Sequence, residues 1–78
     1  MSMSGIDYMS EELEWLKDQN FDFNEAIEFS VNHDIQVYRG SDWQYECMID
    51  GEVHAIMLTS MAALVAGITN FKNRYSPL

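Results

Sequence analysis

The side chains best suited to covalent or metal chemistry are the single cysteine, Cys47, and a nearby histidine, His54. Between them, Asp50-Gly51 is the strongest short hairpin signal in the chain, and a two-residue turn there would place Cys47 opposite His54. Such a pair could supply a thiolate and an imidazole for nucleophilic catalysis, or two ligands of a metal ion. The sequence offers no obvious third ligand and no glycine-rich oxyanion loop. We therefore predict that both residues pack in the core.

Clustered carboxylates are a second potential source of chemistry, because paired carboxylates can transfer protons or bind a hard cation. However, Glu11, Glu12 and Glu14 are close together in sequence, and Asp50-Gly51-Glu52 is a turn, not the alternating acidic loop of a calcium site. The chain also lacks a phosphate-binding loop, a dinucleotide fingerprint and a CxxC motif. We therefore predict a protein that is not an enzyme and that needs no metal or cofactor.

Charge is the outstanding property of the chain, with 13 acidic residues, four basic residues and a net charge of −9. Residues 1–52 contain all 13 acidic and two basic residues and carry −11, whereas residues 53–78 carry +2. Such a molecule repels nucleic acid and anionic membranes and attracts basic protein surfaces. The sequence contains no basic patch that could hold a phosphate backbone, so we expect no direct binding to nucleic acid or membrane.

The acidic residues are densest in the two segments expected to form the first helices. Carboxylates spread over a compact surface can imitate phosphates and occupy the groove of a nucleic-acid-binding protein. An aromatic residue among them can act as an anchor. The predicted partner-binding residues are Glu11, Glu12, Glu14, Trp15, Asp18, Asp22, Glu25 and Glu28. The alternative is that the negative charge only favours solubility.

Length and composition indicate one folded domain over residues 1–78, which at this size buries about 60 to 65% of its unfolded surface. Hydrophobic residues make up 47% of the chain, enough for a folded core despite the charge. The single cysteine excludes an internal disulfide and a cysteine-rich zinc site. The N-terminus lacks the basic start and apolar run of a signal peptide. We therefore expect the protein in the cytoplasm.

Two short helices are predicted in the first half of the chain. The first spans residues 10–19 behind a Ser10 cap, and residues 1–8 before it are expected to be loosely ordered. Its expected buried residues are Met9, Leu13 and Leu16. The second spans residues 23–32, with Asp22 and Glu25 as a capping box and a helix stop at Asn32. Its expected buried stripe is Phe23, Ile27 and Val31. The short connection predicts that the two helices pack as a hairpin pair.

Three strands and one helix are predicted in the second half. The strands begin at Ile35, Trp43 and Glu52, and a helix capped by Thr59 or Ser60 runs to Tyr75, with residues 76–78 as a tail. One sheet face would carry Trp43, Tyr45, Cys47, Ile56 and Leu58. The other would carry Met48, Val53, Ala55 and Met57, covered by helices or left as a sticky surface. The first hairpin has either a two-residue or a three-residue loop. We favour the latter, which adds Ile35 and Val37 to the face of Cys47.

These elements predict an α+β fold in the order α-α-β-β-β-α. A three-stranded antiparallel meander would pack against the C-terminal helix, with the acidic helical pair on the other face or at one edge. A rival interpretation starts from residues 53–71, which carry no fixed charge and are followed by two basic residues. It would make this segment a short membrane span.

Two functions are compatible with these features. In size, charge and lack of catalytic motifs, the chain resembles the small acidic proteins that phages use against host restriction, CRISPR or transcription machinery, a similarity that involves no specific motif. It implies an inhibitor or DNA mimic that docks on a basic nucleic-acid-binding surface of a host effector in the host cytoplasm. The alternative is a structural or adaptor module that uses the apolar second sheet face or a strand edge. Such a module could be a homodimer.

Overall fold

The computed structural model describes residues 4–40 and 42–75, and its elements follow the predicted order. The helices are α1 (Ser4–Asp18), α2 (Phe23–Asn32) and α3 (Ser60–Tyr75). The strands are β1 (Ile35–Arg39), β2 (Tyr45–Ile49) and β3 (Glu52–Met57). They form one antiparallel sheet in the order β1-β2-β3, so the predicted α+β meander is confirmed.

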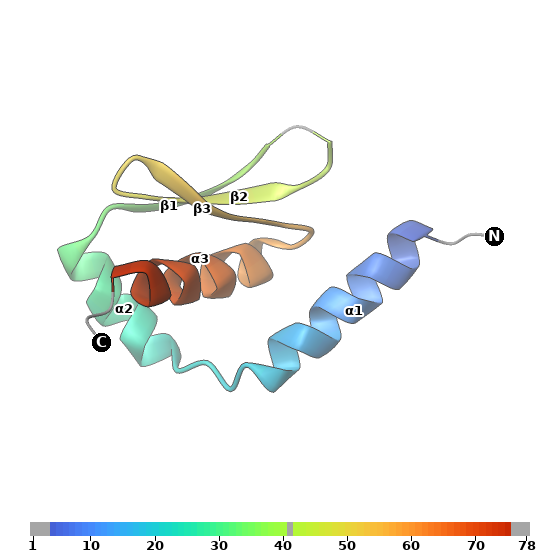
Figure 1. Ribbon diagram of the computed structural model, residues 1–78, viewed down its shortest axis with the longest axis horizontal. Coiled ribbons are helices and arrows are strands. Elements are labelled where there is room, and N and C mark those ends of the chain that lie inside the picture. The colour runs from blue at the N-terminus through green and yellow to red at the C-terminus, as the bar shows by residue number, and fades with distance from the viewer. Residues whose placement is uncertain (1–3, 41, 76–78) are drawn as a thin grey trace.

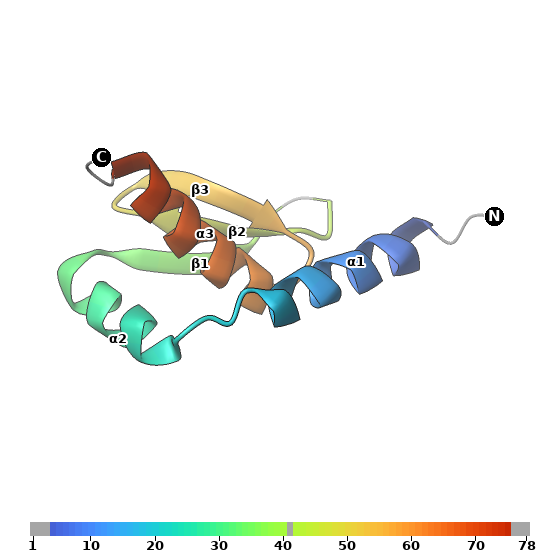
Figure 2. The same ribbon diagram turned by 60° about the horizontal axis from the view of Figure 1, so that its bottom comes forward.

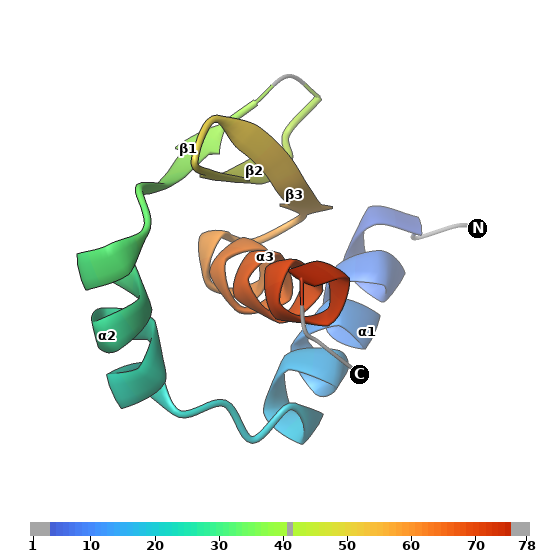
Figure 3. The same cartoon turned by 60° about the vertical axis from the view of Figure 1, so that its left-hand side comes forward.

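All three helices lie on the same side of the sheet (Figure 1). The helix α3 crosses the inner face of the sheet, while α1 and α2 flank α3 on opposite sides (Figure 3). The predicted hairpin between α1 and α2 is therefore wrong, because residues 19–22 carry the chain past α3 (Figure 1). Among the described residues, no helix covers the outer face of the sheet, which is the upper face in Figure 1, whereas Figure 2 shows α3 crossing the opposite face.

The core is built from small side chains that let α3 lie close to the sheet. Its buried residues are Cys47, Ile49, Ala55, Ala62, Ala63, Val65, Ala66 and Ile68. Gly67 is the point of closest approach, because a Cβ added there would lie 2.8 Å from the Cβ of Cys47 and closer still to its sulfur. A side chain at position 67 would therefore push α3 away from β2.

The hairpin between β2 and β3 has the predicted turn but a shifted register. Asp50 and Gly51 have φ of 53° and 88°, as a type I′ turn requires. A β-bulge then inserts His54, so that Cys47 pairs with Ala55 rather than with His54. The extra residue reverses the faces of the rest of β3. Ala55 and Met57 turn towards the core, and Ile56, predicted in the core, is 50% exposed.

The hairpin between β1 and β2 has the favoured register. Val37 pairs with Cys47, and Gly40 donates its backbone N–H to the carbonyl of Gln44, which leaves a three-residue connection over residues 41–43. The prediction of Trp43 as a core residue is wrong. Its φ of 65° is incompatible with a strand, and its side chain is 78% exposed.

The helix α1 begins at Ser4, earlier than the predicted start at Ser10. Residues 4–8, expected to be loosely ordered, therefore belong to the helix, whereas residues 1–3 and 76–78 lie outside the described part of the chain. No proline interrupts residues 4–10, and extending a helix adds a hydrogen bond for each residue fixed. The predicted buried face is wrong for Met9 and Leu13, which are 42% and 43% exposed, whereas Leu16 is partly buried.

The helix α2 has the predicted bounds but is rotated relative to the predicted core. Its expected buried stripe is exposed instead, and the residues of that stripe are Phe23, Ile27 and Val31. Ala26 and Phe29 pack against the core, with the ring of Phe29 edge-on to that of Phe71 at 5.3 Å. Both stripes have helical spacing, and the one that includes Phe29 brings an aromatic ring to α3.

His33 connects the end of α2 to the turn between β2 and β3. The chain leaves α2 in an extended conformation at His33, not in the left-handed stop predicted at Asn32. The Nδ1 atom of His33 lies 2.7 Å from Oδ2 of Asp50, whose Oδ1 accepts the N–H of Asp34 at 3.0 Å. The hydrogen bond to His33, followed by that to Asp34, lowers the pKa of Asp50 below its ordinary value of 3.8.

Replacing Gly67 tests the close contact between α3 and β2. At an unobstructed helix position, Gly→Ala stabilises by up to about 1 kcal/mol. At position 67 we expect Gly67→Ala to lower the free energy of unfolding by about 1 to 3 kcal/mol, because the methyl group overlaps Cys47. Urea titration followed by circular dichroism measures the change, with the exposed Asn73→Ala as a control. A more stable Gly67→Ala variant would contradict the contact.

Replacing Asp50 tests its link to His33. Because the pKa of Asp50 is lowered in the folded state, its ionised form contributes stability above the unfolded pKa of about 3.8. That contribution is lost as the pH falls through the lower folded pKa. We expect the free energy of unfolding of Asp50→Asn to fall less steeply than that of the wild type between about pH 4 and pH 2. Urea titrations over this range measure the slopes, and Asp42→Asn controls for loss of one exposed charge. Parallel curves would argue against the link.

Candidate protein-interaction surface

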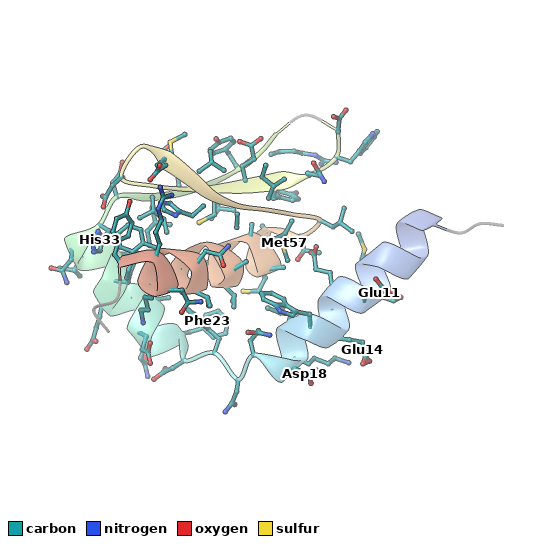
Figure 4. The ribbon with its side chains drawn as sticks, viewed as in Figure 1. Glu11, Glu14, Asp18, Phe23, His33 and Met57 are labelled. Carbon is teal, nitrogen blue, oxygen red and sulfur yellow. The ribbon has the colours of Figure 1, made fainter. Side chains whose placement is uncertain are left out.

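A row of carboxylates runs along the outer side of α1. Glu11, Glu14 and Asp18 are spaced so that they lie within about 60° of one another around the helix. All three are exposed, and Figure 4 shows them along α1 on the side away from the sheet. No lysine, arginine or histidine in the described part of the chain lies within ion-pair distance of them, including the exposed Lys17. We call these three residues the acidic row.

Glu12 points the other way and holds α1 to the rest of the fold. Its Oε1 accepts the backbone N–H of Leu58 at 2.7 Å, and its Oε2 accepts that of Thr59 at 2.8 Å. Thr59 in turn caps α3, as its Oγ1 accepts the N–H of Ala62 at 3.2 Å. The carboxylate of Glu12 therefore lies at the positive end of the α3 dipole, where a negative charge is stabilising. Glu12 is a structural anchor, which distinguishes it from its neighbours in the acidic row.

Trp15 also faces inward, since it is partly buried and packs against the core. Together with Glu12 it fixes the orientation of α1, so that the acidic row faces solvent. The most exposed aromatic residue in the described part of the chain is instead Trp43, at the tip of the first hairpin. The guanidinium of Arg39 lies 5.2 Å from the centre of its ring. The loop residues Gly40 to Asp42 were the available signal that Trp43 belongs to the connection rather than to a strand.

The predicted residues of α2 are separated from the acidic row, because α1 and α2 lie on opposite sides of α3 (Figure 3). Asp22 caps α2, with its Oδ1 accepting the N–H of Asn24 at 2.9 Å. Glu25 forms an ion pair with Lys72 at 2.6 Å, and Glu28 is exposed. The eight predicted residues are thus not one continuous face. Only the acidic row combines exposure, common orientation and lack of a cationic partner within the described chain.

Cys47 and His54 do not form a reactive pair, because the bulge places Ala55 opposite Cys47. Burial raises the pKa of the Cys47 thiol to about 11, so the thiolate needed for nucleophilic attack is disfavoured at neutral pH. The imidazole of His54 is 3% exposed and packs 5.2 Å from the ring of Phe71. Its Nε2 lies 3.3 Å from a carboxylate oxygen of Glu52 without hydrogen-bond geometry. Both side chains are packed against α3, as predicted for core residues.

The described residues offer little support for a metal site or a membrane span. They contain no group of three or more histidine, cysteine, aspartate or glutamate side chains placed to hold a metal ion. No helix among them is long and apolar enough to cross a membrane, and residues 53–71 are divided between β3 and α3. No protein-family model matches the chain, and comparisons with curated proteins and with solved structures find no match either.

Replacing Glu12 tests its role as the anchor of α1. A glutamine side chain has one acceptor oxygen, so Glu12→Gln would leave its NH₂ group against a backbone N–H. We expect the free energy of unfolding to fall by about 2 kcal/mol, because two charge-assisted hydrogen bonds are lost or weakened. Amide exchange at Leu58 and Thr59 should accelerate as well. Glu11→Gln, on the acidic row, is the matched control. Equal stability of the two variants would show that Glu12 does not anchor α1.

Proposed function

We propose that the chain is a non-enzymatic, acidic protein-binding inhibitor that docks on a basic, nucleic-acid-binding surface of a host effector. The observation that supports this function is the acidic row: three exposed carboxylates that share one side of a projecting helix and have no cationic partner in the described chain. Such a row attracts a surface that evolved to bind phosphates. An anti-restriction or anti-CRISPR protein of a phage, acting in the host cytoplasm, would have this chemistry.

The spacing of the acidic row is compatible with imitation of a phosphate backbone. At about 1.5 Å per residue, Glu11 and Asp18 are roughly 10 Å apart along the axis of α1. One strand of duplex DNA carries a phosphate every 3.4 Å or so of its axis, which is about four charges over the same length when both ends are counted. The row, with three carboxylates, therefore presents a somewhat lower linear charge density on a protein scaffold.

The inward-facing residues of α1 favour this function by limiting the cost of binding. Glu12 and Trp15 fix the orientation of the helix before a partner arrives. A surface that is already ordered loses less conformational entropy on association than a flexible acidic segment. Occupation of the partner's phosphate-binding surface would then exclude nucleic acid by direct competition. No reaction is needed for inhibition of this kind.

The outer face of the sheet supports a second candidate function, that of an adaptor or homodimer. Ile56 is 50% and Val53 38% exposed there, and no helix among the described residues covers them. Met57, which we predicted on this face, packs against the core instead. Association through this face would be apolar and would persist at high salt, in contrast to association through the acidic row. Ile56→Asp would disrupt it.

Neutralising the acidic row tests the proposed function. The row variant carries Glu11→Gln, Glu14→Gln and Asp18→Asn. The control variant carries Asp42→Asn, Glu46→Gln and Glu52→Gln, and both change the net charge from −9 to −6. We expect captured partners from nuclease-treated bacterial lysate to bind the row variant about 3-fold to 150-fold more weakly at low salt, since three exposed ion pairs contribute roughly 0.2 to 1 kcal/mol each. The control variant should bind like the wild type.

The identity of the captured partner provides the second part of the test. A partner that binds DNA or RNA, and that an added oligonucleotide displaces from the chain, is the expected result. Binding should also weaken strongly at about 0.5 M salt, where the Debye length falls to roughly 4 to 5 Å. A partner that binds both variants equally, or that resists salt and is lost with Ile56→Asp, would contradict the inhibitor and support the second function.

A further inference from the structure

The outer edge of β1 carries backbone groups that are not used within the sheet. Two hydrogen bonds show which residues of this segment face β2: Asp50 donates its N–H to the carbonyl of Asp34, and Gly40 donates its N–H to that of Gln44. Between such positions, the residues of an antiparallel strand alternate in direction, so every second one points its N–H and C=O away from the neighbouring strand. The residues with outward backbone groups are Ile35, Val37 and Arg39. No other backbone group in the described chain bonds to them.

The opposite edge of the sheet, β3, is protected against pairing. It contains the bulge at His54, and the side-chain amide of Asn70 donates to the carbonyl of His54 at 2.8 Å. Bulges and covering groups are common means by which proteins keep an edge strand from pairing with another chain. The strand β1 has neither feature, since its five residues pair with β2 in unbroken register and include no proline. Such an edge is a template for one more strand.

The charge along β1 favours a second copy of the same strand. Residues 35–41 contain no carboxylate and carry +1, whereas residues 1–52 as a whole carry −11. Asp34 lies at one end of the strand and Arg39 at the other, and neither has an ion-pair partner among the described residues. Two copies of β1 in antiparallel orientation would place the positive end of each beside the negative end of the other. The edge is therefore self-complementary in an acidic chain.

The positions of the outward groups also fit a twofold axis, because residues 35 and 39 are equally far from Val37. With Val37 opposite Val37 of a second copy, Ile35 lies opposite Arg39 of that copy, and every outward N–H and C=O of the strand has a partner. Ile35 also lines an apolar hollow beside α2, which gives the contact apolar surface in addition to its hydrogen bonds. The same backbone geometry would not distinguish a foreign strand, but the opposite charges at the two ends do favour a copy of β1.

We propose that β1 pairs with β1 of a second copy, forming a continuous antiparallel sheet that joins the strands of both chains. The acidic row stays accessible in this dimer, because α1 lies on the side of α3 remote from β1 (Figure 3). Each dimer then presents two acidic rows related by a twofold axis, an arrangement suited to a symmetric partner. The pairing rests on the edge of β1 alone, so it is independent of docking by the acidic row or by the outer face of the sheet.

Amide hydrogen exchange at two protein concentrations tests the pairing. The outward amides of Ile35, Val37 and Arg39 should exchange about threefold or more slowly at about 1 mM than at about 20 µM. Gln36 and Tyr38 are internal controls, since their amides already bond to β2 and should change less. Salt at about 0.3 M should strengthen the dimer, because a Debye length of about 5 to 6 Å screens the repulsion between two acidic chains. Docking by the acidic row has the opposite salt dependence.

Variants locate the contact, with sedimentation at about 0.3 M salt as the measure of dimerisation. Val37→Pro removes the central outward N–H, which β2 does not use, and should abolish the dimer. Arg39→Glu makes both ends of the strand negative and should weaken the dimer about threefold or more. Adding Asp34→Lys to Arg39→Glu makes the ends opposite again at the wild-type net charge and should restore the dimer. Ile56→Asp, on the outer face, should dimerise like the wild type. Circular dichroism confirms that each variant is folded.

Several results would overturn the β1 dimer. One is a chain that stays monomeric at about 1 mM, or whose outward amides exchange at the same rate at both concentrations. A second is a dimer that Ile56→Asp dissociates, which would assign self-association to the outer face. A third is protection of the outward amides only when another protein is added, which would mean that a foreign strand uses this edge. If Val37→Pro does not fold, failure of Asp34→Lys to rescue Arg39→Glu would still contradict the pairing.

Discussion

The close packing of α3 on β2 is the contact on which the rest of the fold depends. It is possible because α3 presents small residues to the sheet and because Gly67 leaves room for Cys47. A larger side chain at Gly67 or at Cys47 would separate α3 from the sheet. It would thereby expose Ile49 and Ile68, the largest fully buried side chains. Since α1 and α2 both attach to α3, the position of α3 also decides where the two helices lie and which of their residues reach solvent.

Glutamates on α1 have two different roles, one structural and one at the surface. Glu12 is tied to the backbone at the start of α3, whereas Glu11 and Glu14, its near neighbours in sequence, have no such partner among the described residues. The difference follows from the helical period, because Glu12 lies about 100° around the axis from Glu11. An acidic composition therefore need not mean a uniformly acidic surface. In this chain, a carboxylate that anchors the helix fixes the direction in which the others point.

Local patterns in the sequence were sufficient for the element order, the Asp50-Gly51 turn, the bounds of α2 and a cap of α3 at one of two residues, of which the structure has Thr59. They were not sufficient where the choice depended on a distant contact. The bulge at His54 is one extra residue in an otherwise regular alternation, and it exchanges Ala55 and Ile56 between the two faces.

In the candidate surface, too, features set by local spacing were predictable and features set by distant contacts were not. The spacing of Glu11, Glu14 and Asp18 could be read from the sequence as one side of a helix. The role of Glu12 could not, because its partners at Leu58 and Thr59 lie 46 and 47 residues away. On α2, two stripes had acceptable helical spacing, and only the packing of Phe29 on Phe71 distinguishes them. Which apolar stripe of α2 is buried depends on tertiary contacts, so a pattern within the ten residues of the helix cannot predict it.

The attachment of α2 to the fold limits its stability. This helix has no buried residue, and it is held by partly buried contacts, the ion pair between Glu25 and Lys72, and the link from His33 to Asp50. Exposed ion pairs contribute little, so α2 should be among the first elements to open locally. Phe23 and Ile27 remain exposed, because Ala26 and Phe29 are the residues of α2 that pack against the core. The contact of Phe29 with Phe71 therefore decides both how α2 is held and which of its apolar residues reach solvent.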